Sequence, residues 1–212
     1  MGSGSVNPAF RRFIVLEGID GSGTTTQLGR LGNHLAHAGI RHWITCEPTR
    51  RPEGSLLRRI LSGELDAHPG TVAYLFAADR HQHLHGSGGI VERLESGDVV
   101  VCDRYVLSSL AYQSAACGSG LPRMLNSGFP VPGLTLFFRI PPAVSLRRLA
   151  GRERLDIYER LEFLETVSAE YERALGEAAL AGGRIVIVDA AEPEEIVWNA
   201  VRGAVDTHLG PA

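Results

Sequence analysis

Lysine is absent from this chain of 212 residues, because all 21 of its basic residues are arginines. Cysteine is scarce, and Cys46, Cys102 and Cys117 have neither the spacing of metal ligands nor a redox C-x-x-C pattern. We therefore expect reduced thiols and a cytoplasmic protein. No apolar run is long enough to span a bilayer, which argues against a membrane partner. The formal net charge of -3 gives no electrostatic basis for general nucleic-acid binding.

The remaining composition is that of one folded domain, with 44% hydrophobic and 21% charged residues. At this length a substantial core forms without help from disulfides or metals. The Gly/Ser-rich start predicts a disordered lead-in over residues 1–9. We expect residues 10–212 to form a single domain.

Short apolar runs alternate with longer amphipathic ones, which predicts β-α-β units in a parallel sheet. The predicted strands are Phe13–Leu16, His42–Cys46, Val99–Cys102, Leu134–Ile140 and Arg184–Val188. The predicted helices are Thr24–Ala38, Ser55–Leu61, Thr71–His85, Ile90–Ser96, Leu107–Ala115, Ala143–Ala150, Ile157–Ala179 and Glu194–Ala204. Several strands are continuously apolar, as expected for a sheet that is covered on both faces. The segment "CGSGLP", residues 117–122, is expected to be a surface loop.

The stretch "FIVLEGIDGSGTTTQ", residues 13–27, runs from a strand through a glycine-rich turn into a helix, which predicts a phosphate-binding loop. The expected phosphate-binding residues are Gly18, Gly21, Ser22, Gly23, Thr24, Thr25 and Thr26. Thr25 falls where the pattern G-x-x-x-x-G-K-[ST] places a hydroxyl for Mg²⁺, and Thr24 stands where that pattern has lysine. The alternative is a glycine-rich turn that binds no ligand.

Two further stretches carry side chains suited to a phosphorylated ligand. In "VVVCDRYVLSSLAYQ", a buried strand brings Asp103 and Arg104 to the edge of the sheet where ligands bind, and these residues suit Mg²⁺ and phosphate. In "YLFAADRHQH", Phe76 and Arg80 lie four residues apart on one helical face. From that face the phenylalanine ring can stack on a nucleotide base, and the guanidinium can hydrogen-bond the edge of the same base. A surface ion pair and a core phenylalanine are the simpler alternatives.

Together these stretches resemble the thymidylate kinase family of P-loop kinases over nearly the whole chain. The resemblance rests on "EGIDGSGTTT", "TCEPTRRPEGS", "LFAADRHQH", "DRYVLSSLAYQ" and "TLFFRIPPAVSLRRL". The block "DRYVLSSLAYQ" matches the family's D-R-Y/H-x-x-S-x-x-A-Y-Q pattern at every fixed position. Three positions depart from the family: Thr24 replaces lysine, Cys46 replaces the arginine of T-R-E-P, and Arg139 stands where aspartate is usual.

The resemblance implies a three-layer α/β fold of the P-loop NTPase type. It has five parallel strands ordered 2-3-1-4-5, helices on both faces and a lid at about residues 147–160. It implies transfer of the γ-phosphate of ATP to dTMP, giving dTDP and ADP for dTTP synthesis. The implied partners are dTMP, ATP as co-substrate and Mg²⁺ as cofactor, in a homodimer.

The resemblance also implies roles for single residues. Asp20 would accept a hydrogen bond from the 3′-hydroxyl, Phe76 would stack on thymine, and Arg80 would reach its carbonyl edge. Arg104 would hold the phosphate of dTMP, and Tyr112 would leave no room for a 2′-hydroxyl. The complete dTMP-binding set is Asp20, Arg50, Phe76, Arg80, Arg104, Ser109, Tyr112 and Gln113, and the Mg²⁺ ligands are Thr25 and Asp103. A solvated surface charge is the alternative for Arg50.

Because the phosphate loop lacks its lysine, another residue has to supply the positive charge that catalysis needs. Family members without an arginine in the phosphate loop supply one from the lid, and here Gly21 follows Asp20. The expected catalytic set is therefore Asp20, Arg104, Arg152 and Arg154, with Arg148 behind them. The alternatives are that Arg50 leans in from the acceptor side, or that ATP is held poorly and catalysis is slow. Exposed ion pairs are the simpler interpretation of any single lid arginine.

Three other functions stay open. One is a nucleotide-binding protein with impaired catalysis. Another is a related kinase that acts on a deoxynucleoside or on another nucleoside monophosphate, although Arg104 with Arg50 favours an acceptor that carries a phosphate. Adenylate kinase would require a different acceptor pocket from the Phe76 and Arg80 pair.

Overall fold

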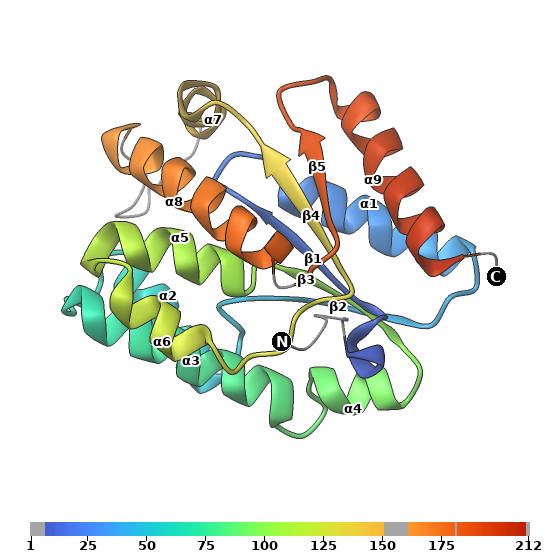
Figure 1. Cartoon of the computed structure of the whole chain (residues 1–212), viewed down its shortest axis with the longest axis horizontal. Coiled ribbons are helices and arrows are strands. Elements are labelled where there is room, and N and C mark those ends of the chain that lie inside the picture. Colours follow the sequence, from blue (N-terminus) through green and yellow to red (C-terminus); the bar gives the residue numbers. More distant parts are fainter. Residues whose placement is uncertain (1–6, 151–160, 181, 211–212) are drawn as a thin grey trace.

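The computed structural model describes residues 7–150, 161–180 and 182–210. Its centre is a five-stranded parallel sheet (Figure 1). The strands are β1 (Phe13–Gly18), β2 (His42–Cys46), β3 (Val99–Asp103), β4 (Leu134–Arg139) and β5 (Ile185–Asp189). Their order is β2-β3-β1-β4-β5, which confirms the predicted α/β class and the predicted strand order.

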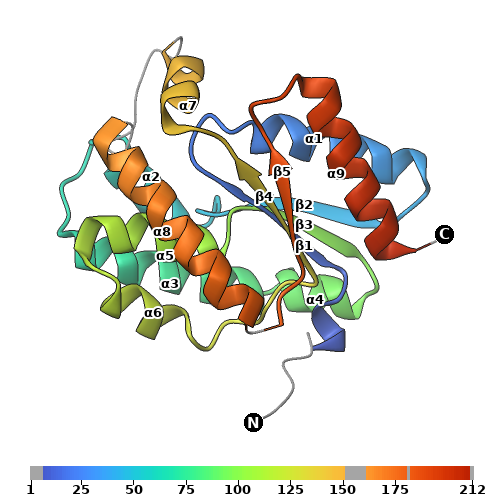
Figure 2. The same ribbon diagram turned by 45° about the horizontal axis from the view of Figure 1, so that its top comes forward.

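Helices cover both faces of this sheet, with α1 and α9 on one face and α3, α5 and α8 on the other (Figures 1 and 2). The helices are η1 (Pro8–Phe10), α1 (Thr24–His37), α2 (Pro52–Leu61), α3 (Pro69–His85), α4 (Ile90–Glu95), α5 (Val106–Cys117), α6 (Gly120–Asn126), α7 (Pro142–Leu149), α8 (Leu161–Leu180) and α9 (Glu194–Leu209). None of these described helices has the length and apolarity needed to cross a lipid bilayer.

The core follows from the alternation of side chains along the strands. In β1, Ile14 and Leu16 belong to the larger buried cluster, which includes Leu31 of α1. Phe13 and Val15 belong to a second cluster. Because every residue of β1 is buried, the glycine-rich turn that follows it starts from a fixed point.

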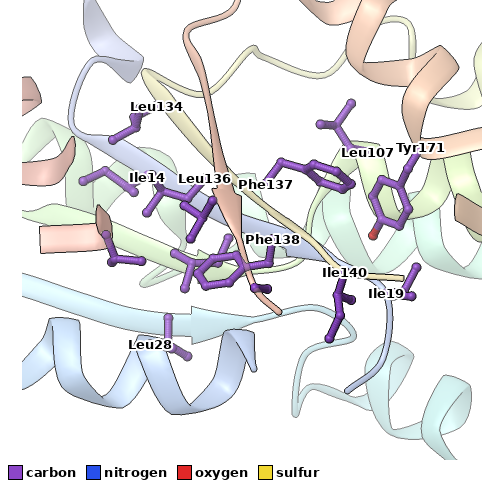
Figure 3. Packing of buried hydrophobic residues seen from close by; sticks show 14 of the residues in the cluster. Ile14, Ile19, Leu28, Leu107, Leu134, Leu136, Phe137, Phe138, Ile140 and Tyr171 are labelled. Atoms are coloured by element: carbon purple, nitrogen blue, oxygen red, sulfur yellow. The ribbon is translucent and has the colours of Figure 1, made fainter. Parts of the chain in front are cut away.

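Strand β4 shows the same alternation. Figure 3 shows Leu136 and Phe138 on one side of β4 and Phe137 beside Tyr171 of α8, with ring centroids 5.2 Å apart. Phe138 is fully buried, so its truncation to alanine would cost about 3–5 kcal/mol. This packing fixes the strand that precedes α7.

The clearest differences from the predicted elements are one missed helix, two shifted helix ends and a short helix in the expected lead-in. The expected loop at residues 117–122 was wrong at Cys117, the last residue of α5, and from Gly120 onward, where α6 begins. Pro122 is tolerated because the first turn of a helix needs no N–H from it. Helix α2 begins at Pro52 rather than Ser55, and α9 continues to Leu209. Of the expected lead-in, residues 7–9 are described, and Pro8 and Ala9 take part in η1.

Candidate functional site

A cavity of about 1240 Å³ opens at the edge of the sheet where β1, β2 and β3 end. This volume is larger than that of most pockets that hold a single small ligand. Ten predicted site residues line it: Asp20, Thr25, Arg50, Phe76, Arg80, Asp103, Arg104, Ser109, Tyr112 and Gln113. The structure thus brings together residues from four separate stretches of sequence.

The phosphate loop joins β1 to α1. Gly21 and Gly23 have φ values of 78° and 90°, in the left-handed region that glycine adopts without strain. At Gly18, a Cβ atom would lie 2.7 Å from Ser22 Oγ, so only glycine fits. Helix α1 begins at Thr24, and its N-terminus therefore presents backbone N–H groups toward the end of the loop. Thr24 itself is 6% exposed and brings no charge.

Helix α7 packs directly on this loop. Ser145 Oγ donates a hydrogen bond to the backbone oxygen of Asp20, and a Cβ atom at Gly21 would lie 2.7 Å from Ser145 O. The predicted lid begins here, with Arg147 and Arg148 exposed in the last turn of α7. Arg152 and Arg154 lie outside the described residues.

The predicted magnesium ligands face each other. Thr25 Oγ1 donates to Asp103 Oδ2 at 3.1 Å, and the buried Oδ1 of Asp103 has no hydrogen-bond partner among the described residues. In the described part of the chain, no group of three or more His, Cys, Asp or Glu side chains could hold a metal. Mg²⁺ is usually bound by one or two carboxylates, with phosphates and water as its other ligands. The pair therefore fits Mg²⁺ that is bound together with a nucleotide.

An ion pair connects the phosphate loop to Arg104, which lies between the end of β3 and the start of α5. Arg104 Nη2 lies 2.6 Å from Asp20 Oδ1, while Tyr112 donates to Asp20 Oδ2 at 2.7 Å and accepts from the Asp20 N–H at 3.0 Å. Burial, followed by the neighbouring Asp20 carboxylate, raises the pKa of Tyr112 well above its ordinary value. The phenol therefore stays protonated and remains a donor.

The backbone of Arg104 has φ 69°, an uncommon conformation for a residue with a side chain. Its N–H donates to Leu16 O at 2.8 Å, and its Nη1 donates to Gly18 O at 2.9 Å. These bonds hold the guanidinium over the start of the phosphate loop.

Arg80 forms the buried wall of the cavity and is 1% exposed. Its Nε donates to Glu47, its Nη1 donates to Asn126, and its Nη2 donates to Tyr105 O and Ser109 Oγ. These four bonds leave one of its five N–H hydrogens, on Nη1, without an acceptor among the described residues.

Three other predicted residues complete the acceptor side. Phe76 is half-buried one turn before Arg80 and packs on the cluster formed by α2 and α3. Gln113 is 2% exposed, and its Oε1 has no partner in the described part of the chain. Arg50 is exposed and lines the cavity.

Two buried carboxylates support this wall and were missed from the sequence. Glu47 Oε1 bonds His83 Nδ1 at 3.0 Å, and its Oε2 bonds Arg80 Nε at 2.8 Å. Asp79 accepts the N–H of Thr49 at 2.8 Å and also its hydroxyl proton. Both carboxylates fasten the loop after β2 to α3. All the residues that make these bonds lie in the segments "CEPT" and "ADRHQH".

Glu17 was also missed, although it directly precedes Gly18. It accepts hydrogen bonds from the N–H of Tyr105 at 3.0 Å, from the Ser108 hydroxyl, and from Tyr171 at 3.2 Å. Burial raises its pKa above the ordinary value, against the lowering effects of the Ser108 hydrogen bond and of the Arg104 and Arg80 charges. Two signals pointed to it: it is the first residue of the segment "EGIDGSGTTT", and it lies in a buried strand.

Comparisons with known proteins agree with this geometry. The family model described as thymidylate kinase matches residues 16–201. The chain is 38% identical over 192 residues to a Treponema pallidum protein named "Putative thymidylate kinase", covering 89% of this chain and 92% of the relative. It is 38% identical to the thymidylate kinase of Alkalilimnicola ehrlichii, with 92% of each chain covered. It is 34% identical to that of Geobacillus sp. strain WCH70, with 92% and 95% covered.

Proposed function

Because the chain belongs to the thymidylate kinase family, we propose that it transfers the γ-phosphoryl group of ATP to dTMP, giving dTDP and ADP. The observation that carries this proposal is the Asp20–Arg104 ion pair, since it joins the phosphate loop to the wall of the cavity that holds Phe76 and Arg80. A donor nucleotide on the loop and an acceptor on the wall would meet at this pair.

The acceptor side suits a thymidine nucleotide. The remaining Nη1 hydrogen of Arg80 can donate to a thymine carbonyl, and the buried Gln113 Oε1 can accept the N3–H. Phe76 supplies a stacking ring, and Tyr112 stands beside Asp20 where the sugar would lie. Two base contacts and one stacked ring define the orientation of the base.

The phosphate of dTMP needs a cation that is already in place. Nε of Arg104 and the second hydrogen of Nη2 are not engaged by the described residues. The guanidinium can therefore hold Asp20 and a phosphate at once. Charge-assisted bonds of this kind are about twice as strong as neutral ones.

On the donor side, Thr25 and Asp103 would hold Mg²⁺, which when bound neutralises charge on the phosphate oxygens. The lost lysine leaves a further charge to be supplied. A cation about 4 Å from these oxygens contributes about 4 kcal/mol at an effective dielectric of about 20. We assign this charge to Arg152 and Arg154, because α7 packs on Gly21 and Arg152 follows the end of that helix by three residues.

The first experiment measures ADP production from ATP and Mg²⁺ with dTMP, thymidine or dUMP as the acceptor. Turnover with dTMP well above the other two supports the proposal. Preference for thymidine would indicate a deoxynucleoside kinase, and comparable turnover with dUMP would show that the site does not select the 5-methyl group, which is the one difference between thymine and uracil.

One observation favours a second candidate. Thr24 is neutral and nearly buried, so a protein that binds dTMP without turning over ATP is the competing function. Calorimetric binding of dTMP, measured beside the turnover assay, separates the two. The homodimer and the cytoplasmic location stay predictions, and light scattering of the purified protein tests the first.

A further inference from the structure

His83 is a buried histidine of α3 that the proposed function does not use. It lies three residues after Arg80 and is 1% exposed. Its Nδ1 lies 3.0 Å from Glu47 Oε1, and its Nε2 lies 2.8 Å from Thr45 Oγ1. The Trp43 ring packs nearly perpendicular to the imidazole, with ring centroids 5.6 Å apart. Because both ring nitrogens have partners and one edge is packed, the imidazole is held in one orientation.

Glu47 connects this imidazole to Arg80. The second carboxylate oxygen, Oε2, lies 2.8 Å from Arg80 Nε and 2.7 Å from Arg80 Nη2. Glu47 is 4% exposed, so these two side chains, rather than water, are its partners. One buried carboxylate is therefore shared between a histidine and an arginine, with one oxygen bonded to each.

The chemistry of these groups fixes the direction of the bond between His83 and Glu47. A carboxylate only accepts hydrogen bonds, so Nδ1 of His83 carries the hydrogen and donates it to Glu47. The Thr45 hydroxyl at the other ring nitrogen can donate or accept. Position 83 therefore requires a donor on the side of Glu47, whereas the bond to Thr45 sets no such requirement.

The direction of the Arg80 guanidinium depends on this carboxylate. Cζ of Arg80 lies 4.9 Å from the ring centroid of Tyr105 and 5.4 Å from that of Phe129, so aromatic rings pack on the guanidinium. Within the guanidinium plane, the direction of each N–H follows from the hydrogen bonds, and Glu47 is the carboxylate that is paired with it. A Glu47 that has lost its bond to His83 is free to turn, and the remaining Nη1 hydrogen of Arg80 would turn with it.

We propose that His83 is a positioning residue for base recognition, because it holds Glu47 and thereby aims the remaining Nη1 hydrogen of Arg80 at the 4-carbonyl of thymine. This inference rests on the proposed function and deepens it. Cytosine carries an amino group in place of that carbonyl, so a correctly aimed donor distinguishes dTMP from dCMP. Loss of the bond between His83 and Glu47 should therefore weaken the selection of dTMP over dCMP.

The test compares the affinities of dTMP and dCMP, measured by calorimetry, in the wild type, His83→Gln and His83→Asn. The side-chain amide of asparagine falls near the Nδ1 position of histidine, and that of glutamine falls near the Nε2 position. His83→Gln therefore loses the donor to Glu47, and we expect about tenfold weaker binding of dTMP with little change for dCMP. His83→Asn keeps the donor and should bind dTMP within about threefold of the wild type.

His81→Gln is the matched control, because it makes the same substitution at an exposed position of the same helix. It should alter neither affinity. The KM for ATP should be unchanged in all three variants, since the bonds of His83 lie on the acceptor side, and this result also shows that the variants are folded. If His83→Gln does not fold, His83→Asn decides: retained selection of dTMP supports the inference, and lost selection overturns it.

Three other results would overturn the inference. Equal weakening of dTMP and dCMP in His83→Gln would show that His83 only shapes the pocket. Equal losses in His83→Gln and His83→Asn would show that the donor to Glu47 is not the cause, and unchanged dTMP affinity in His83→Gln would show that Arg80 needs no such support. Wild-type protein that binds no dTMP would overturn the proposed function instead.

Discussion

The two halves of the cavity are built in different ways. The acceptor side is formed by side chains that bond to one another. Arg80 donates hydrogen bonds to Glu47 and Ser109, and Arg104 is paired with Asp20. On the donor side, the loop consists of glycine backbone and a helix N-terminus, and the buried Oδ1 of Asp103 has no partner in the described part of the chain.

This difference teaches that binding and chemistry are separable in this molecule. The acceptor side is held together by contacts among its own side chains, whereas for the donor side we propose cations that come from elsewhere, namely Mg²⁺ and the lid arginines. Changes on the donor side should therefore lower turnover and leave dTMP affinity unchanged. Four variants test this separation.

Asp103→Asn should have the largest effect. It removes the carboxylate charge that we assign to Mg²⁺ and keeps the size of the side chain, so turnover should fall by about a hundredfold, which corresponds to about 3 kcal/mol. The measurement is kcat as a function of Mg²⁺ concentration, with dTMP affinity measured in parallel. Asp98→Asn, at the other end of β3, is the matched control. A parallel loss of dTMP affinity would break the comparison.

The double variant Arg152→Ala/Arg154→Ala should lower turnover by about tenfold or more, because a charge near the transferred phosphoryl group is lost. Affinity for dTMP should not change, since neither arginine belongs to the acceptor wall that we describe. Arg202→Ala on α9, whose guanidinium contacts Asn199, controls for general loss of surface charge. Undiminished turnover would rule out the lid as the source of the charge.

Thr24→Lys should have a smaller effect in the wild type. We expect a severalfold change in kcat and in the KM for ATP. The substitution returns the positive charge of the G-x-x-x-x-G-K-[ST] pattern to a position that is 6% exposed. In the Arg152→Ala/Arg154→Ala background, the same substitution should restore about tenfold in turnover, because two cations that fill one role are not additive. Equal effects in both backgrounds would show that lysine and lid act independently. A large change in dTMP affinity would place Thr24 on the acceptor side.

The sequence predicted the sheet well because periodicity and glycine stops are local signals. Gly39 and Gly97 have φ values of 69° and 84° after α1 and α4, at positions where a left-handed residue ends a helix. Helix α6 was missed because Gly120 and Pro122 lower its local helix propensity, while Pro122 and Asn126 are buried by tertiary packing.

The site was predictable wherever chemistry sits in a contiguous motif, as it does for Thr25 and Asp103. The buried groups that hold other site residues in place were not predictable. Glu47 gains its role only from a contact across elements, with Arg80 on α3. Single-sequence patterns do not specify such pairings, because they depend on which helix packs beside which strand.

Glu17 offers the smallest and sharpest test, because it joins the two halves. It directly precedes Gly18 and accepts bonds from Tyr105 and Ser108 at the start of α5. Burial raises its pKa above the ordinary 4.5, so the folded state favours the protonated form. Its contribution to stability is therefore complete below pH 4.5 and is lost as the pH rises through the folded-state pKa.

Glu17→Gln stays neutral and should lose this dependence on pH. The melting temperature of the wild type, relative to that of the variant, should fall between pH 4.5 and neutrality, by about 2–4 °C for each kcal/mol. Thermal unfolding followed by circular dichroism across this range measures the difference, with the exposed Glu165→Gln on α8 as the control. A difference that rises with pH would mean that Arg104 and the hydrogen bonds outweigh burial. Glu17 would then be a charged anchor, with the phosphate loop held to the acceptor wall by electrostatics.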